Sequence, residues 1–284
     1  MDHRLRIGIK HSGQDCTADE LRSVWRVTDD AGFDHLWAFD HLASIGPGGP
    51  DRVVFESWSL LAAMAATTSS VRIGLLVTGN TYRHPGLLAK IATTVDHLSG
   101  GRLELGLGAG WSELEHQMLG LEGLDHRVGR LSEALRVIKS LWTEERTTFA
   151  GRYYRLVDAI SNPKPVQRPH PPIWIGASGE RMLRLAARHA DVWNPSGRVG
   201  AELESAVRCA EQLDEACAES GRDPSGIRRS TQLWWDGSAD GLVERVAPWV
   251  QSGFRDVILI VAGPQAPQQA EAAGQVLPEL RGIA

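Results

Sequence analysis

The stretch RIGLLVTGNTYRHPGLLAKIATTVDHLSGGRLELGLGAGW, residues 72–111, predicts a strand, a helix and a second strand in that order. Residues 72–77 form a short run of apolar, often branched side chains, which is typical of a strand buried on both faces. Pro85 is expected to open the helix, because its missing N–H costs nothing at the first helical position. Residues 103–107 form the next apolar run. Two strands joined by a helix make a parallel crossover.

Functional side chains are expected where these two strands end. In parallel sheets and barrels, sites gather beyond the carboxyl ends of the strands. Here those ends are the loops 78–84 and 108–113, and both are rich in glycine and polar residues.

The same alternation of strand and helix extends over the whole chain and predicts one (β/α)₈ barrel. A predicted small hairpin at residues 149–157, with Gly151 at its turn, and a proline-rich segment interrupt it, so we expect an insertion at about 143–170. Without a linker or a change of composition, residues 1–284 form one predicted domain. The predicted strands are 5–10, 35–39, 72–77, 103–107, 173–175, 190–193, 229–234 and 256–261. Thr17, with Glu20 three residues on, predicts a capping box at the start of the first helix, and residues 268–280 are expected to close the chain as its last helix.

Composition limits the classes of partner. The 284 residues carry a net charge of −5 with a pI near 6.1, and the absence of a basic cluster argues against nucleic acid as a partner. Three cysteines without metal-ligand spacing argue against a disulfide framework and a metal site. The first residues lack the apolar run of a signal peptide, and no stretch is long and apolar enough for a membrane span. We therefore expect a cytoplasmic protein.

Asp40 and His41 directly follow the predicted strand 35–39, so both side chains can reach the mouth of the barrel. Histidine titrates near neutral pH and is the usual residue for moving a proton in catalysis. The alternative is structural: a carboxylate that caps a helix and a partly exposed histidine.

GASGE, residues 176–180, connects a predicted strand to a predicted helix. Small residues let backbone N–H groups approach an anion, and a helix N-terminus favours negative charge, so a phosphate is the natural ligand. A plain tight turn is the alternative. The chain has neither a Walker pattern nor a GxGxxG followed by an acidic residue, which argues against ordinary nucleotide or NAD binding.

Three further patterns permit two interpretations each. Gly106 and Gly108 either let a ligand lie against the backbone or relieve crowding between barrel and helices. His84 either contacts a ligand or fixes its loop. Glu113 and Glu115 either bind a metal together with the adjacent His116 or form a solvated face, and the spacing favours the solvated face.

Tryptophan is abundant, with ten in the chain, and several follow predicted strands. Trp111, Trp193 and Trp234 are the candidates for a pocket that binds a flat ligand. Large core side chains are the alternative interpretation.

Four long segments in the same order resemble the bacterial luciferase-like monooxygenase family, especially its branch that uses the deazaflavin coenzyme F420. They cover most of residues 5–194. The segments are GFDHLWAFDH (32–41), VRIGLLVTGNTYRHPGLLAK (71–90), DHLSGGRLELGLGAGW (96–111) and PPIWIGASGERMLRLAARHADVWN (171–194).

The resemblance implies a TIM barrel, usually homodimeric, that binds a flavin or deazaflavin with its ring in the barrel mouth. It implies a non-prolyl cis peptide at Leu76–Val77 beneath the ring, where strain persists only if the surroundings enforce it. Asp40 would lie near the ring, and His41 would donate or accept a proton. The remaining expected cofactor contacts are Gly79, Asn80, Gly106, Gly108, Gly176, Ala177, Ser178 and Gly179.

Trp111 departs from one branch of that family. In its sugar-phosphate dehydrogenases a glutamate follows the Gly-x-Gly of the fourth strand, and here Trp111 occupies that position. The resemblance therefore implies hydride transfer between F420 and an organic substrate that is not clearly a sugar phosphate. The alternatives are an FMN-dependent luciferase-like monooxygenase and a non-catalytic protein that binds a flavin or deazaflavin.

Overall fold

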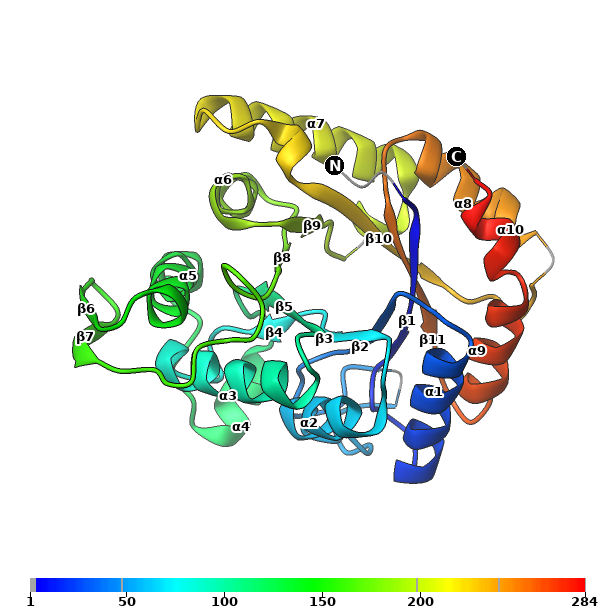
Figure 1. Ribbon diagram of the computed structural model, residues 1–284, viewed down its shortest axis with the longest axis horizontal. Coiled ribbons are helices and arrows are strands. Elements are labelled where there is room, and N and C mark those ends of the chain that lie inside the picture. The colour runs from blue at the N-terminus through cyan, green and yellow to red at the C-terminus, as the bar shows by residue number, and fades with distance from the viewer. Residues whose placement is uncertain (1–3, 47, 198, 240, 284) are drawn as a thin grey trace.

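A computed structural model describes residues 4–46, 48–197, 199–239 and 241–283. Within these ranges one barrel accounts for the parallel strands, and its strands and helices are labelled in Figure 1. The predicted domain 1–284 also includes residues 1–3, 47, 198, 240 and 284, which lie outside the described residues.

Eight parallel strands form a closed barrel, because β3 at one end of the strand order also pairs with β5 near the other end. This confirms the predicted fold class. A two-residue strand, β4 (Thr78–Gly79), continues the line of β3 and pairs with β5. The barrel strands are β1 (Arg6–His11), β2 (His35–Ala38), β3 (Arg72–Leu75), β5 (Leu103–Gly108), β8 (Ile173–Gly176), β9 (Val192–Asn194), β10 (Arg228–Trp234) and β11 (Asp256–Val261).

Helices surround the barrel on its outside (Figure 1). The first begins at Thr17, whose side chain caps the Glu20 N–H while Glu20 caps the Thr17 N–H, which confirms the predicted capping box. The helices are α1 (Ala18–Asp30), α2 (Ser57–Thr67), α3 (Pro85–Leu98), α4 (Glu113–Leu119), α5 (Arg127–Thr143), α6 (Glu180–His189), α7 (Leu203–Glu219), α8 (Leu242–Gln251), α9 (Ala266–Gln275) and α10 (Leu277–Arg281), with short 3₁₀ turns η1 (Val199–Ala201) and η2 (Pro224–Gly226).

Two helical segments differ from the prediction. Residues 113–119 form the short helix α4 rather than a connection, and Gly120 ends it in the left-handed conformation that glycine adopts most readily. The predicted last helix 268–280 is two helices, α9 and α10. They meet at Val276, just before Pro278, which cannot continue the hydrogen-bond pattern of α9.

The insertion is an antiparallel hairpin of β6 (Thr147–Ala150) and β7 (Arg155–Ala159), followed by the proline-rich segment. It projects beyond α5 at the edge of the molecule (Figure 1). It agrees with the predicted position at about 143–170 and leaves the barrel intact.

The barrel interior contains an apolar layer that lies apart from the core between strands and helices. Trp37 and Trp174 cross edge to face with ring centroids 4.6 Å apart, and the imidazole of His35 packs against both. Leu76, Val192 and Ile258 complete the layer. It fills the barrel below the mouth, as layered side chains do in such barrels.

No helix in the described part of the chain combines the length and apolarity that a bilayer crossing requires.

Candidate active site

His41 lies just beyond β2 at the barrel mouth and is held by a buried carboxylate. Its Nδ1 is 3.0 and 3.1 Å from the two carboxylate oxygens of Glu115. An ionised carboxylate can only accept hydrogen bonds, so Nδ1 carries a proton and donates it. Nε2 is then the ring atom that can give or take a proton at the mouth.

Glu115 is fixed in its ionised form by several donors. The backbone N–H groups of Leu42 and Ala43 donate to it over 2.5 and 3.0 Å, and the Tyr82 hydroxyl donates to its other oxygen. Burial opposes ionisation, but these hydrogen bonds and the neighbouring His41 lower the pKa of Glu115 to about 2. The interpretation of Glu115 as part of a solvated face is therefore wrong.

Asp40 is buried and faces Arg83 rather than His41. The guanidinium binds both carboxylate oxygens at 2.6 and 3.0 Å, and the backbone N–H of Gly79 donates to one of them over 3.2 Å. Burial raises the pKa of Asp40, and the charge of Arg83 partly offsets that rise. Glu56 binds the same guanidinium at 2.7 Å, so Arg83 joins the β2 loop to the start of α2.

The peptide between Leu76 and Val77 is cis, as the resemblance implied, and lies where β3 gives way to β4. Two glycines of β5 make room for it. A Cβ at Gly106 would lie 2.0 Å from the Leu75 carbonyl oxygen, and a Cβ at Gly108 would lie 2.7 Å from Val77. These glycines allow β5 to approach the cis segment of the neighbouring strand closely. The crowding that they relieve is therefore between strands of the barrel and not between barrel and helices.

The loop after the cis peptide carries polar atoms without partners. Thr78 Oγ1 and Asn80 Oδ1 are buried, and neither has a hydrogen-bond partner within the described residues. The Asn80 amide nitrogen lies 3.4 Å from the Tyr154 hydroxyl, and its backbone N–H donates to the Gly108 carbonyl. Buried polar atoms left unpaired beside a mouth are atoms that a polar ligand can satisfy.

The loop 176–179 leads from β8 into α6, as predicted. Ser178 bonds to the backbone and hydroxyl of Ser196, and the Ala177 N–H donates to the Asn194 carbonyl. Gly179 is the N-cap of α6, and no side chain caps the first turn of this helix. A helix start that lacks a side-chain cap leaves N–H groups that an anion can bind.

The three candidate pocket tryptophans lie in different places. Trp111 is 60% exposed, and its ring centroid is 5.4 Å from that of His41. Trp234 is 63% exposed at the end of β10, whereas Trp193 is fully buried in the layer between barrel and helices, where its indole N–H donates to Ala177. The structure thus brings Trp111 to His41 and places Trp193 outside the mouth as a core side chain.

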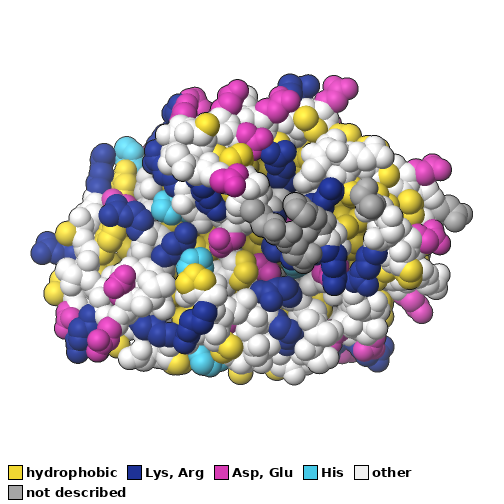
Figure 2. Space-filling view, turned by 45° about the horizontal axis from the view of Figure 1, so that its top comes forward, with side chains coloured by type: hydrophobic (Ala, Val, Ile, Leu, Met, Phe, Trp, Pro, Cys, Tyr) yellow, Lys and Arg dark blue, Asp and Glu magenta, His cyan; other side chains and the backbone are white. Residues whose placement is uncertain are grey.

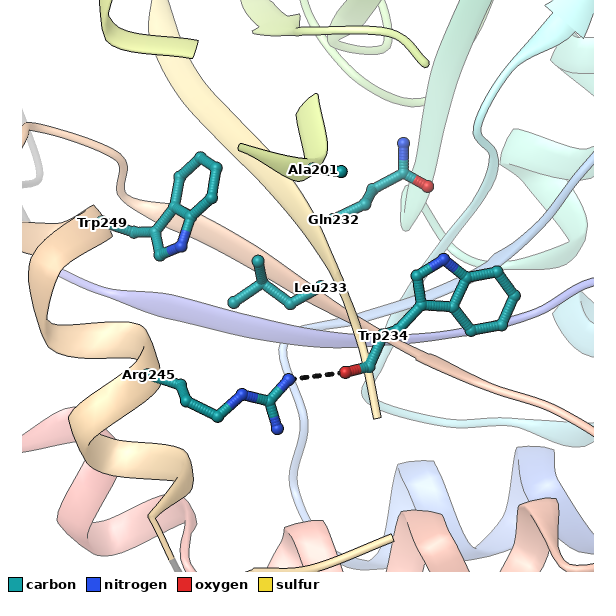
Figure 3. Close-up of a pocket in the computed structure, with 6 residues that line it drawn as sticks. All are labelled: Ala201, Gln232, Leu233, Trp234, Arg245 and Trp249. Atoms are coloured by element: carbon teal, nitrogen blue, oxygen red, sulfur yellow. Dashed lines mark hydrogen bonds between the residues drawn. The ribbon is translucent and has the colours of Figure 1, made fainter. Parts of the chain in front are cut away.

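A pocket of about 350 Å³ surrounds the end of β10. In Figure 3 the Trp234 indole and the Gln232 amide point to one side of β10, and Leu233, Trp249 and Arg245 lie on the other. Arg245 donates to the Trp234 carbonyl over 2.7 Å and so fixes this strand end.

Sequence reasoning missed Glu115, Arg83 and Lys10. The first two act on residues 74 and 43 positions away, and no local pattern in the chain marks such a pairing. Lys10, whose ammonium donates to the Leu76 carbonyl oxygen over 2.9 Å, had a signal. It is a charged residue close to the carboxyl end of the strand LRIGIK, whose other charged residue, Arg6, stands near the opposite end.

Charged residues of both signs are interspersed on the face shown in Figure 2. Among the described residues, no group of three His, Cys, Asp or Glu side chains is arranged to hold a metal ion.

The barrel, the cis peptide and the His41 site are features that can be compared with known proteins, and this comparison identifies the family of the chain. The family description "luciferase-like monooxygenase" matches residues 5–273. The chain belongs to this family.

Named relatives in the family include two dehydrogenases. An F420-dependent glucose-6-phosphate dehydrogenase of Microbacterium testaceum is 35% identical over 221 residues, which are 77% of this chain and 64% of the relative. An F420-dependent hydroxymycolic acid dehydrogenase of Mycobacterium tuberculosis is 32% identical over 80% of this chain and 62% of the relative. The chain thus spans just under two thirds of the length of these relatives.

Among solved structures, an F420-dependent secondary alcohol dehydrogenase in complex with an F420–acetone adduct matches with a TM-score of 0.85. It covers 98% of this chain and 99% of that one at 19% identity, a level at which the likeness concerns the fold.

Proposed function

We propose that this protein is an F420-dependent oxidoreductase that transfers a hydride between the deazaflavin and an organic substrate. The observation that carries the proposal is the His41–Glu115 pair at a barrel mouth that also holds the cis Leu76–Val77 peptide. The names of the dehydrogenase relatives support F420 as the cofactor.

The residues present fit a deazaflavin. Leu76 and Val77 offer an apolar surface for the ring, with the unpaired Thr78 Oγ1 and Asn80 Oδ1 beside it. The loop 176–179 and the uncapped start of α6 suit a phosphate. When bound, the cofactor supplies or accepts the hydride, and the protein contributes orientation and a proton.

His41 is the proposed catalytic acid or base. A carbonyl that accepts a hydride at carbon needs a proton at oxygen, and the reverse reaction needs a base at the same place. Glu115 holds the imidazole by Nδ1, which directs Nε2 toward this task, as carboxylates do in other catalytic histidine pairs. Asp40 acts indirectly: with Arg83 and the Gly79 N–H it fixes the β2 loop that carries His41.

Trp111 favours an apolar or flat substrate over a sugar phosphate. Its exposed indole lies beside His41, so it contributes apolar surface next to the reacting atoms. Trp234 is proposed as a second, more distant pocket residue.

Cytoplasmic location and a homodimer complete the proposal. Cys16, Cys209 and Cys217 are free and buried, which suits a reducing compartment. Leu87 and Leu98 of α3 are exposed apolar side chains that a second copy could cover. Light scattering after size exclusion would test the dimer: a monomeric mass would refute it.

A fluorescence titration with F420 and, separately, with FMN tests the cofactor. The exposed tryptophan beside His41 provides a signal that a ligand in the mouth should quench. We expect micromolar binding of F420 and much weaker binding of FMN. The opposite preference would favour a flavin monooxygenase, and binding of neither would leave the family likeness as one of fold alone.

A further inference from the structure

Lys10 points into the barrel from the upper part of β1. Its ammonium donates to the Leu76 carbonyl oxygen over 2.9 Å and to Gln232 Oε1 over 2.7 Å. The first of these oxygens belongs to the cis peptide itself. Gln232 in turn donates to Asn194, and Asn194 to Ser230, so Lys10 is the charged end of a chain of neutral groups.

No carboxylate in the described ranges pairs with this ammonium. Both of its partners among the described residues are neutral oxygens, and burial lowers the pKa of Lys10 to about 8. A buried cation is costly unless an anion compensates it, and proteins normally provide one. Lys10 keeps some solvent exposure. Because Trp37 and Trp174 fill the barrel below it, its exposed side faces the mouth.

The other charged groups described at the mouth already have partners within the protein. Arg83 is neutralised by Asp40 and Glu56, and Glu115 is bonded to His41, Tyr82 and two backbone N–H groups. Among the residues that the structure describes at this mouth, Lys10 is thus the cation whose charge remains available to a ligand.

We propose that Lys10 supplies the compensating charge for a negatively charged cofactor ring against Leu76–Val77, and so makes the site prefer an ionised deazaflavin over the neutral ring of FMN. The inference rests on the proposed function and deepens it. The ring of F420 carries an acidic hydroxyl that ionises near neutral pH, whereas the FMN ring is uncharged there. A hydride brings a further negative charge to whichever ring accepts it, so the same ammonium also favours the reduced state.

The ring ionisation of bound F420 provides the first test, because it changes the visible absorbance of the cofactor. An opposite charge within about 4–6 Å lowers the pKa of an acid by roughly 1–3 units. We expect the ring pKa in the complex with the parent protein to lie at least about one unit below that of free F420. An unchanged or raised ring pKa would overturn the inference, and this measurement needs no variant.

Two substitutions provide the second test. Lys10→Gln keeps an N–H donor for the Leu76 carbonyl but removes the charge, and Lys10→Arg keeps the charge. We expect Lys10→Gln to weaken F420 binding about tenfold or more, the equivalent of one pKa unit, while FMN binding changes less than about threefold. Lys10→Arg should retain most of the preference for F420.

The comparison of the two cofactors separates charge from structure. If the role of Lys10 were merely structural, Lys10→Gln would weaken the binding of F420 and of FMN to a similar extent. That result would overturn the inference while leaving the proposed function intact. Failure of the parent protein to bind F420 would overturn both. Circular dichroism of the variants shows whether each is folded before it is titrated.

Discussion

At the lower end of the barrel Asp256 is enclosed by His35 and Arg228, at 3.1 and 3.3 Å, whereas at the upper end the His41–Glu115 pair lies beside an exposed tryptophan. Both ends place charged groups inside a barrel of eight strands. Below, the charges are paired and covered by the layer of Trp37 and Trp174. Above, they hold side chains in position around a mouth.

The difference separates stability from chemistry. Glu104 illustrates the lower end: it is buried, pairs with Arg72 and accepts the indole N–H of Trp174 over 2.5 Å. Each of its two carboxylate oxygens has a donor within the protein, although the buried His35 Nδ1 and Asp256 Oδ2 nearby have no hydrogen-bond partner among the described residues. At the mouth, Thr78 Oγ1 and Asn80 Oδ1 remain unpaired, which is costly unless a ligand binds. Substitutions at the two ends should therefore fail in different ways.

The largest effect is expected for His41→Ala. Removal of a general acid or base lowers turnover by about 10² to 10⁴-fold, while the barrel below is untouched. Steady-state kinetics with F420 and the melting temperature are the measurements. His97→Ala, which alters a histidine of α3 bonded to the Lys164 carbonyl, is the matched control and should retain activity. Full turnover in His41→Ala would refute the proton role.

Trp174→Ala should show the opposite pattern. Loss of a fully buried indole costs about 3–5 kcal/mol of unfolding free energy and leaves one of the two carboxylate oxygens of the buried Glu104 without a donor. Urea unfolding measures this loss. Trp234→Ala, at an exposed tryptophan, is the control and should change the stability by no more than about 0.5 kcal/mol. Equal losses in both variants would contradict the division between the two ends.

Lowering the pH should reduce the stability of the folded protein by protonating Glu115. Its pKa in the folded protein, about 2, is below the ordinary value of 4.5, so its contribution is present above pH 4.5 and is lost as the pH falls toward 2. The contribution is on the order of 2 kcal/mol. We expect the stability of Glu115→Gln to fall less than that of the parent between pH 6 and pH 3. Parallel pH profiles would show that Glu115 is not held in its ionised form.

The smallest effect is expected for Trp111→Ala. Loss of one aromatic contact weakens the binding of a flat or apolar substrate by up to about tenfold, since such contacts contribute roughly 0.5–1.5 kcal/mol. The change should appear in KM, with kcat within about threefold of the parent. A large loss of kcat would indicate that the indole positions His41 rather than the substrate.

Local patterns sufficed for most of the fold. The apolar runs predicted all eight barrel strands, and Pro85 and the Thr17–Glu20 pair predicted two helix starts. Each of these signals lies within a few residues of the structure that it predicts. Helix α4 was missed because its exposed apolar side chains show no single buried face, among them Leu114, Met118 and Leu119.

The site was predictable only in part. His41 and Asp40 follow a strand, so their place at the mouth could be predicted, and the cis Leu76–Val77 peptide followed from the family resemblance. Their partners could not, since Glu115 and Arg83 reach them only after the chain has closed into a barrel. Trp193 was predicted at the mouth and lies in the core instead. Its strand has only three residues, too few for the alternation of side chains to reveal which side of the barrel Trp193 faces.

The close fit of Gly106 and Gly108 against the cis segment has a consequence for how this barrel can change over evolutionary time. Any side chain at Gly106 would collide with the Leu75 carbonyl, so that position admits essentially one residue. Trp111, a few residues further along the same chain segment, is more than half exposed and meets no such barrier. Residues at the rim of the mouth can therefore change and bring new substrate preferences, while the proposed cofactor surface a few residues away stays constant.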